Sequence, residues 1–111
     1  MPAAAVLKRI DKAKDDLVAS LVELCRVPAI GPANGGEGEG KKADLVRRWI
    51  QELGLKPERF DSPDDRVPGG KRPNVVARYG KGPRLWVLCH LDVVPAGDAA
   101  AWRVDPFQPK V

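Results

Sequence analysis

The chain has 111 residues, a length that predicts a single domain with a modest core, and 43% of them are hydrophobic. Its 19 basic and 15 acidic residues are interspersed, so the net charge of +4 predicts no nucleic-acid partner, which would need basic residues clustered on one face. We expect a cytoplasmic protein without a membrane partner, because the chain has no signal-peptide pattern, no apolar run near the ~20 residues that span a bilayer, and two isolated cysteines.

The first predicted element is an amphipathic helix over residues 3–25. Lysines and aspartates occupy one face, and apolar side chains recur at every third or fourth position on the other, namely Ile10, Ala13, Leu17, Leu21 and Leu24. Val27 precedes Pro28 and so avoids the α region, which ends the helix. We interpret the apolar stripe as core packing.

A glycine-rich loop over residues 29–40 connects this helix to a second one, predicted over residues 41–53 with Gly54 as its C-terminal cap. Residues 35–41 fit the start of the phosphate-binding pattern GxxxxGK[ST]. However, Lys42 stands where that pattern needs a hydroxyl for magnesium, and a helix precedes the loop instead of a strand. We therefore reject nucleotide binding and interpret the loop as a flexible connection.

Three strands are predicted in the second half of the chain. Residues 55–60 are typical of an edge strand, because Pro57 cannot donate to a ladder. Residues 74–79 and the apolar run that begins at Arg84 are separated by a short turn, which predicts an antiparallel hairpin. Both faces of the apolar run are largely apolar, which predicts a buried central strand. The expected fold is α/β, with two helices packed on a mixed sheet that includes this hairpin.

The single histidine, His90, and Asp92 lie where the central strand ends, and side chains two positions apart on a strand share a face. Neutral imidazole is the commonest metal ligand, and a metal-bound histidine usually donates its other ring N–H to a carboxylate. The pair is therefore a candidate metal site. On these residues alone, an ordinary histidine followed by a turn is the simpler interpretation. Asp64 and Asp65, in the polar loop 61–73, are also interpreted as turn residues.

Four segments resemble the N-terminal part of the M20 metallopeptidases, especially the acetylornithine deacetylase and succinyl-diaminopimelate desuccinylase group. They are PANGGEGEG (32–40), RPNVVARYG (72–80), HLDVVPAGD (90–98) and W-x-x-DPF (102–107), in the order and spacing of the family. The resemblance implies that His90 binds one ion of a two-zinc centre, with Co²⁺ or Mn²⁺ as alternative metals. It also implies that Asp92 is the catalytic-site carboxylate that orients the imidazole, and that the substrate is an N-acyl amino acid or small peptide hydrolysed at an amide bond.

The same resemblance implies that part of the family's machinery lies beyond the position equivalent to Val111. The remaining metal ligands, the general-base glutamate and the dimerisation domain all follow that position in the family. Residues 1–111 are therefore expected to form a partial zinc-hydrolase catalytic domain that is inactive alone, belonging to a protein that is a homodimer at full length. The alternative function is a non-catalytic small α/β interaction module or a degenerate fragment.

Overall fold

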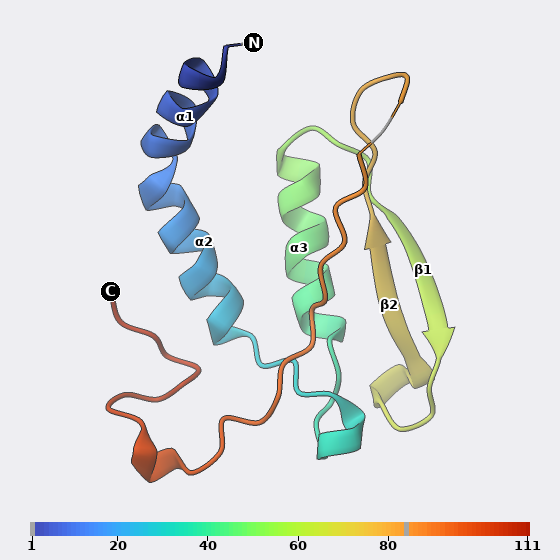
Figure 1. The fold of residues 1–111 in the computed structure, drawn as a ribbon. Coiled ribbons are helices and arrows are strands. Elements are labelled where there is room, and N and C mark those ends of the chain that lie inside the picture. The colour runs from blue at the N-terminus through green and yellow to red at the C-terminus, as the bar shows by residue number, and fades with distance from the viewer. Residues whose placement is uncertain (1, 84) are drawn as a thin grey trace. The chain divides into compact units, whose positions relative to one another are not determined.

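The computed structural model describes residues 2–83 and 85–111, and these residues form three α-helices and one two-stranded sheet (Figure 1). Residues 28–97 make up one compact unit, and the chain on either side of them makes up the other. The α/β class predicted from the sequence is confirmed. No helix in the described part of the chain combines the length and the apolar character needed to cross a membrane.

The helix predicted over residues 3–25 is two helices, α1 (Ala3–Lys12) and α2 (Lys14–Arg26), so the prediction of one uninterrupted helix is wrong. The break lies at Ala13, whose backbone N–H is shared between the carbonyl oxygens of Arg9, at 3.2 Å, and Ile10, at 3.0 Å. Such sharing tightens the last turn of a helix toward 3₁₀ geometry, and neither helix has a side-chain cap at its N-terminus. The apolar periodicity continues across the break, which is why it did not reveal the break.

The second predicted helix is confirmed as α3 (Gly40–Glu52), which follows a short 3₁₀ turn, η1 (Pro32–Asn34). Gly54 lies in the left-handed region with a φ of 76°, as expected for a C-terminal cap. The N–H groups of Gly54 and Leu55 donate to the carbonyl oxygens of Gln51, at 2.9 Å, and Ile50, at 3.1 Å, which is the hydrogen-bond pattern of a Schellman motif.

The sheet is an antiparallel hairpin of β1 (Glu58–Pro63) and β2 (Lys71–Val76), with Glu58 opposite Val76 and Pro63 opposite Lys71. Both strands begin about three residues away from their predicted starts, and β2 pairs with β1 instead of with the apolar run. A 3₁₀ turn, η2 (Pro68–Gly70), lies in the connecting loop, which is closed by the Asp64 N–H donating to the Gly70 carbonyl oxygen at 3.0 Å. This closure specifies the pairing, and the polar composition of the loop gave no sign of it.

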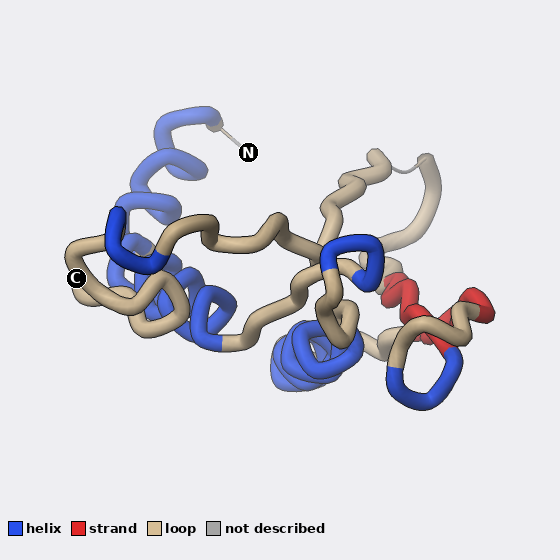
Figure 2. The backbone as a smooth tube through the Cα atoms, turned by 90° about the horizontal axis from the view of Figure 1, so that it is seen from below, coloured by secondary structure: helices blue, strands red, loops and turns tan. Residues whose placement is uncertain are grey.

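The central strand predicted from Arg84 onward is wrong. Arg84 itself lies outside the described residues, and residues 85–92 form no ladder and belong to the loops, which are drawn tan in Figure 2. The sole parallel pairing among the described residues is an isolated bridge between Ile30 and Val93. A β-rich run becomes a strand only when a neighbouring strand takes up its N–H and C=O groups. Here β2, the strand that was predicted to pair with this run, is paired with β1 instead.

The small core of the second unit lies between the loop of residues 29–39, α3 and the connecting loop of the hairpin. Its buried hydrophobic residues are Ala29, Ala43, Leu45 and Val67. Two polar residues, Glu39 and Lys42, are buried with them. The glycine-rich loop is therefore part of the core and not a free connection, which corrects its interpretation as a flexible segment.

Candidate functional site

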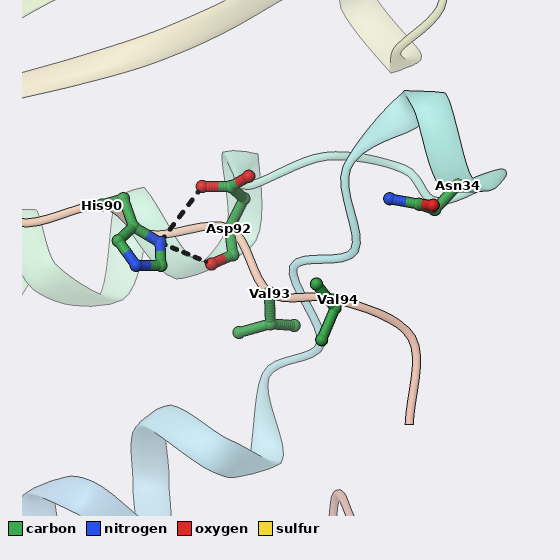
Figure 3. A pocket seen from close by; sticks show the side chains of 5 residues that line it. All are labelled: Asn34, His90, Asp92, Val93 and Val94. Atoms are coloured by element: carbon green, nitrogen blue, oxygen red, sulfur yellow. Dashed lines mark hydrogen bonds and ion pairs between the residues drawn. The ribbon is translucent and has the colours of Figure 1, made fainter. Parts of the chain in front are cut away.

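An open pocket of about 340 Å³ lies at the end of the segment that carries His90 (Figure 3). It is lined by His90, Asp92, Val93 and Val94 from this segment and by Asn34 from η1. The volume is at the lower end of the range of ~300–1,000 Å³ that is usual for small-molecule sites, and a few polar groups beside apolar walls are the usual lining.

His90 and Asp92 lie together, although the strand that was expected to align them is absent. The His90 Nδ1 lies 2.9 Å from the Asp92 backbone oxygen and 3.3 Å from Oδ1 of the Asp92 carboxylate (Figure 3). A carbonyl oxygen can only accept a hydrogen bond, so in the neutral ring Nδ1 carries the proton and donates it to Asp92. The other ring nitrogen, Nε2, then keeps its lone pair, and the imidazole is 85% exposed.

The backbone that follows Asp92 is hydrogen-bonded to the glycine-rich loop. The Val93 N–H donates to the Ala29 carbonyl oxygen at 2.9 Å, and a Cβ added at Gly31 would lie 3.8 Å from Oδ2 of Asp92. The loop in turn folds on itself, because the Gly38 N–H donates to the Ile30 carbonyl oxygen at 3.0 Å. The backbone next to the imidazole is therefore fixed by residues about sixty positions earlier in the chain.

Two arginines of the hairpin and its connecting loop form ion pairs near the glycine-rich loop. Arg72 donates twice to the Glu39 carboxylate, from Nε to Oε1 at 2.9 Å and from Nη2 to Oε2 at 3.1 Å. The Arg66 side chain donates to Asp64, and its hydrogen bonds are the main cause that lowers the pKa of Asp64 from 3.8 to about 2. Asp64 also accepts the backbone N–H of Arg66 at 3.1 Å, so the sequence-based interpretation of Asp64 as a turn residue is confirmed.

Sequence reasoning missed three residues that the structure places at or near the site. Asn34 lines the pocket, and it lies within the PANGGEGEG segment without any spacing that points to a site. Glu39 and Arg72 are 33 positions apart and form their pair through the fold. No local periodicity connects such positions, so only a knowledge of the hairpin could have found the pair.

The described residues supply one donor for a metal and not a complete metal site. No three side chains of the histidine, cysteine, aspartate and glutamate types gather in the described ranges 2–83 and 85–111. Catalytic zinc sites normally use about three protein ligands and keep one position open. Of a metal site, the described residues therefore provide His90 as a single ligand, and Asp92 orients its ring by accepting a hydrogen bond from the other ring nitrogen.

Comparison with known proteins gives relatives that are named as desuccinylases and metallohydrolases. The chain is 42% identical over 94 residues to a succinyl-diaminopimelate desuccinylase of Rhodospirillum centenum, an alignment that covers 83% of this chain and 22% of the relative. A desuccinylase of Parvibaculum lavamentivorans is 39% identical over 87 residues, covering 78% of this chain and 20% of that protein. The chain is related to the M20 metallohydrolases. An uncharacterized metallohydrolase of Methanocaldococcus jannaschii, 30% identical over 96 residues, agrees, with 80% of this chain and 23% of the relative covered.

This M20-related chain spans about a fifth of the length of the curated relatives it matches. No protein-family model and no solved structure matches it. The resemblance stated from the four sequence segments is confirmed, and the relatives are hydrolases. The roles of His90 and Asp92 stay predictions, now with a geometry attached to them.

Proposed function

We propose that this chain contributes part of the metal centre of an M20-type zinc-dependent hydrolase that cleaves an amide bond in an N-acyl amino acid or small peptide. In this proposal His90 is a zinc ligand through Nε2. The observation that carries the proposal is the contact of Nδ1 with Asp92, since it places the ring proton away from the exposed nitrogen. The relatives named desuccinylase and metallohydrolase support the same class of reaction.

The residues of the chain have separate tasks in this mechanism. The backbone oxygen of Asp92 accepts the Nδ1 proton, and its carboxylate lies beside the ring, which fixes the tautomer and leaves the Nε2 lone pair available to a metal. Val93 and Val94 form the apolar wall of the pocket next to the imidazole. When bound, the zinc would lower the pKa of a coordinated water to about 7 and polarise the substrate carbonyl.

Other parts of the proposal concern the protein beyond this site. Residues 1–111 form a partial catalytic domain, and the remaining ligands of two zinc ions, with Co²⁺ or Mn²⁺ as alternatives, come from outside these residues. The general base comes from there as well, and the full-length protein is a homodimer. An N-succinyl amino acid is the substrate to test first, given the names of the relatives, and an N-acetyl amino acid, which the family resemblance implies, is the second.

The test compares zinc content and hydrolysis of N-succinyl and N-acetyl amino acids in the full-length protein and in its His90→Ala variant. We expect the variant to lose bound zinc and to hydrolyse more than about a hundredfold more slowly, because even a residue behind a metal ligand contributes 10–100-fold. Cys89→Ala is the matched control, since Cys89 is the exposed neighbour of His90 and has no role in the proposal. Unchanged zinc content and rate in His90→Ala would overturn the proposal.

One observation favours a second candidate, a non-catalytic interaction module. The side chains of residues 85–88 are apolar and strongly exposed, and exposed apolar surface is typical of a segment that binds another chain. The two candidates differ in the effect of His90→Ala. A binding module would keep its partner and its oligomeric state in this variant, whereas the hydrolase would lose its metal.

A further inference from the structure

Arg72 and Glu39 form the most buried long-range ion pair that the structure describes. The guanidinium of Arg72, on β2, donates to both carboxylate oxygens of Glu39, at 2.9 and 3.1 Å. The side chain of Glu39 is 10% exposed, and Glu39 is the residue directly before α3. Two parallel charge-assisted hydrogen bonds fix the orientation of both partners, and at low exposure water competes with them poorly.

Glu39 ends the glycine-rich loop that supports the site. Within the loop the Gly38 N–H donates to the Ile30 carbonyl oxygen, and a Cβ added at Gly36 would lie 2.1 Å from that same oxygen. Ile30 is also the residue that bridges to Val93. The connection from β2 to the site is therefore continuous: Arg72 holds Glu39, Glu39 closes the loop, and the loop holds the backbone that follows Asp92.

The charge of Arg72 faces more than one carboxylate. Its Nη1 lies 4.0 Å from Oδ2 of Asp64. The pKa of Arg72 is raised above its ordinary value, first by the hydrogen bonds to Glu39 and further by the negative charges of Glu39, Asp64 and Asp92. Arg72 is thus the cation whose field reaches both the loop closure and the carboxylate next to His90.

We propose that Arg72 and Glu39 are positioning residues for the His90 site: their pair clamps the glycine-rich loop to β2, and the loop holds the backbone of Asp92 and Val93 on which the imidazole rests. The link to metal binding rests on the function proposed above, whereas the clamp itself can be measured without metal. The pair acts on the imidazole indirectly, mainly through the loop and also through the charge of Arg72 at the Asp92 carboxylate.

The clamp is tested by hydrogen exchange in the metal-free full-length protein, comparing wild type, Arg72→Gln and Glu39→Gln. We expect the amides of Gly38 and Val93 to exchange about tenfold faster in both variants, the loss expected for a hydrogen bond to a charged group. The amide of Leu55, in the C-terminal cap of α3, should keep its rate. Arg59→Gln is the matched control, because Arg59 lies on β1 and pairs with Asp61, at 2.6 Å, and Asp44, at 3.4 Å, outside this loop.

The double variant Glu39→Gln/Arg72→Gln and the conservative variant Arg72→Lys keep the test decisive if a single variant is strongly destabilised. Exchange at Gly38 and Val93 in the double variant should be no faster than in either single one, and Arg72→Lys should recover part of the protection because it retains the charge without the bidentate geometry. Equal acceleration at Leu55, or wild-type rates at Gly38 and Val93, would overturn the positioning role.

Zinc affinity provides the second readout. We expect Arg72→Gln to weaken zinc binding by about tenfold, at the lower limit of the effect of residues behind a ligand, and Arg72→Lys to restore part of it. If His90→Ala leaves zinc binding unchanged, the proposed function fails while the exchange result stands. If His90→Ala abolishes zinc binding and Arg72→Gln changes neither zinc affinity nor exchange, the positioning pair fails alone.

Discussion

The glycine-rich loop of residues 29–39 and the apolar run of residues 85–92 have exchanged the roles that their compositions suggest. The loop is polar and rich in glycine, yet Ala29 and Glu39 are buried, its backbone accepts a hydrogen bond from Val93, and its Glu39 side chain accepts hydrogen bonds from Arg72. The run is apolar and β-rich, yet Leu88 is 96% exposed and the run forms no ladder in the part of the chain that the structure describes.

The difference shows that partners, more than intrinsic propensity, decide which segment becomes fixed. Glycines allow the loop backbone to approach its neighbours closely, and a carboxylate at its end meets an arginine from β2. The apolar run has strong β-propensity, but such propensity mainly reflects packing against neighbouring strands. The site lies where the two segments meet, at the hydrogen bond from Val93 to Ala29. Three changes test this comparison.

Gly36→Ala should have the largest effect. The added Cβ would lie 2.1 Å from the Ile30 carbonyl oxygen, which is backbone and cannot move aside without shifting the loop. We expect a loss of about 2–3 kcal/mol in the free energy of unfolding, at the upper end of the cost of overpacking. Urea denaturation measures it.

Gly40→Ala is the matched control for this prediction. An added Cβ at Gly40, the first residue of α3, meets no heavy atom within 4 Å, and alanine is the better helix former. A gain of up to ~1 kcal/mol is expected. Equal destabilisation by the two substitutions would show that the loop is not tightly packed around Gly36.

An intermediate effect is expected from acid. The pKa of Asp64 is lowered from 3.8 to about 2, chiefly by hydrogen bonds from Arg66, so the folded protein favours the carboxylate more strongly than the unfolded chain does. This contribution to stability is complete above about pH 4 and is lost as the pH falls toward about 2. Urea midpoints measured across this range should fall less steeply in Arg66→Gln than in wild type. An unchanged slope in the variant would contradict the assignment of the pKa shift to this pair.

The parts of the molecule that follow from local sequence were predictable, and the parts that depend on distant partners were not. The helix α3 and its cap at Gly54 follow from periodicity and from the need for a left-handed residue. The pairing of β2 depended on closure of the 64–70 loop, which no pattern reveals. The contact of His90 with Asp92 was expected for the wrong reason, because it arises from two residues close in sequence and not from a shared strand face. The role of Arg72 could not be predicted from the sequence, since its partner Glu39 lies 33 positions away.

Leu88→Ser should have the smallest effect, and it is the change that most directly challenges the comparison. In the chain of residues 1–111 the Leu88 side chain is already in water, so its replacement should change the free energy of unfolding by no more than ~0.5 kcal/mol. Leu45→Ser is the matched control, because Leu45 is buried in α3 and should cost about 2–4 kcal/mol. A cost for Leu88→Ser near that of Leu45→Ser would mean that the apolar run is packed after all. A cost that appears only in the full-length protein would mean that residues outside 1–111 cover the run there, and the exposed segment would then mark where the rest of that protein packs beside His90.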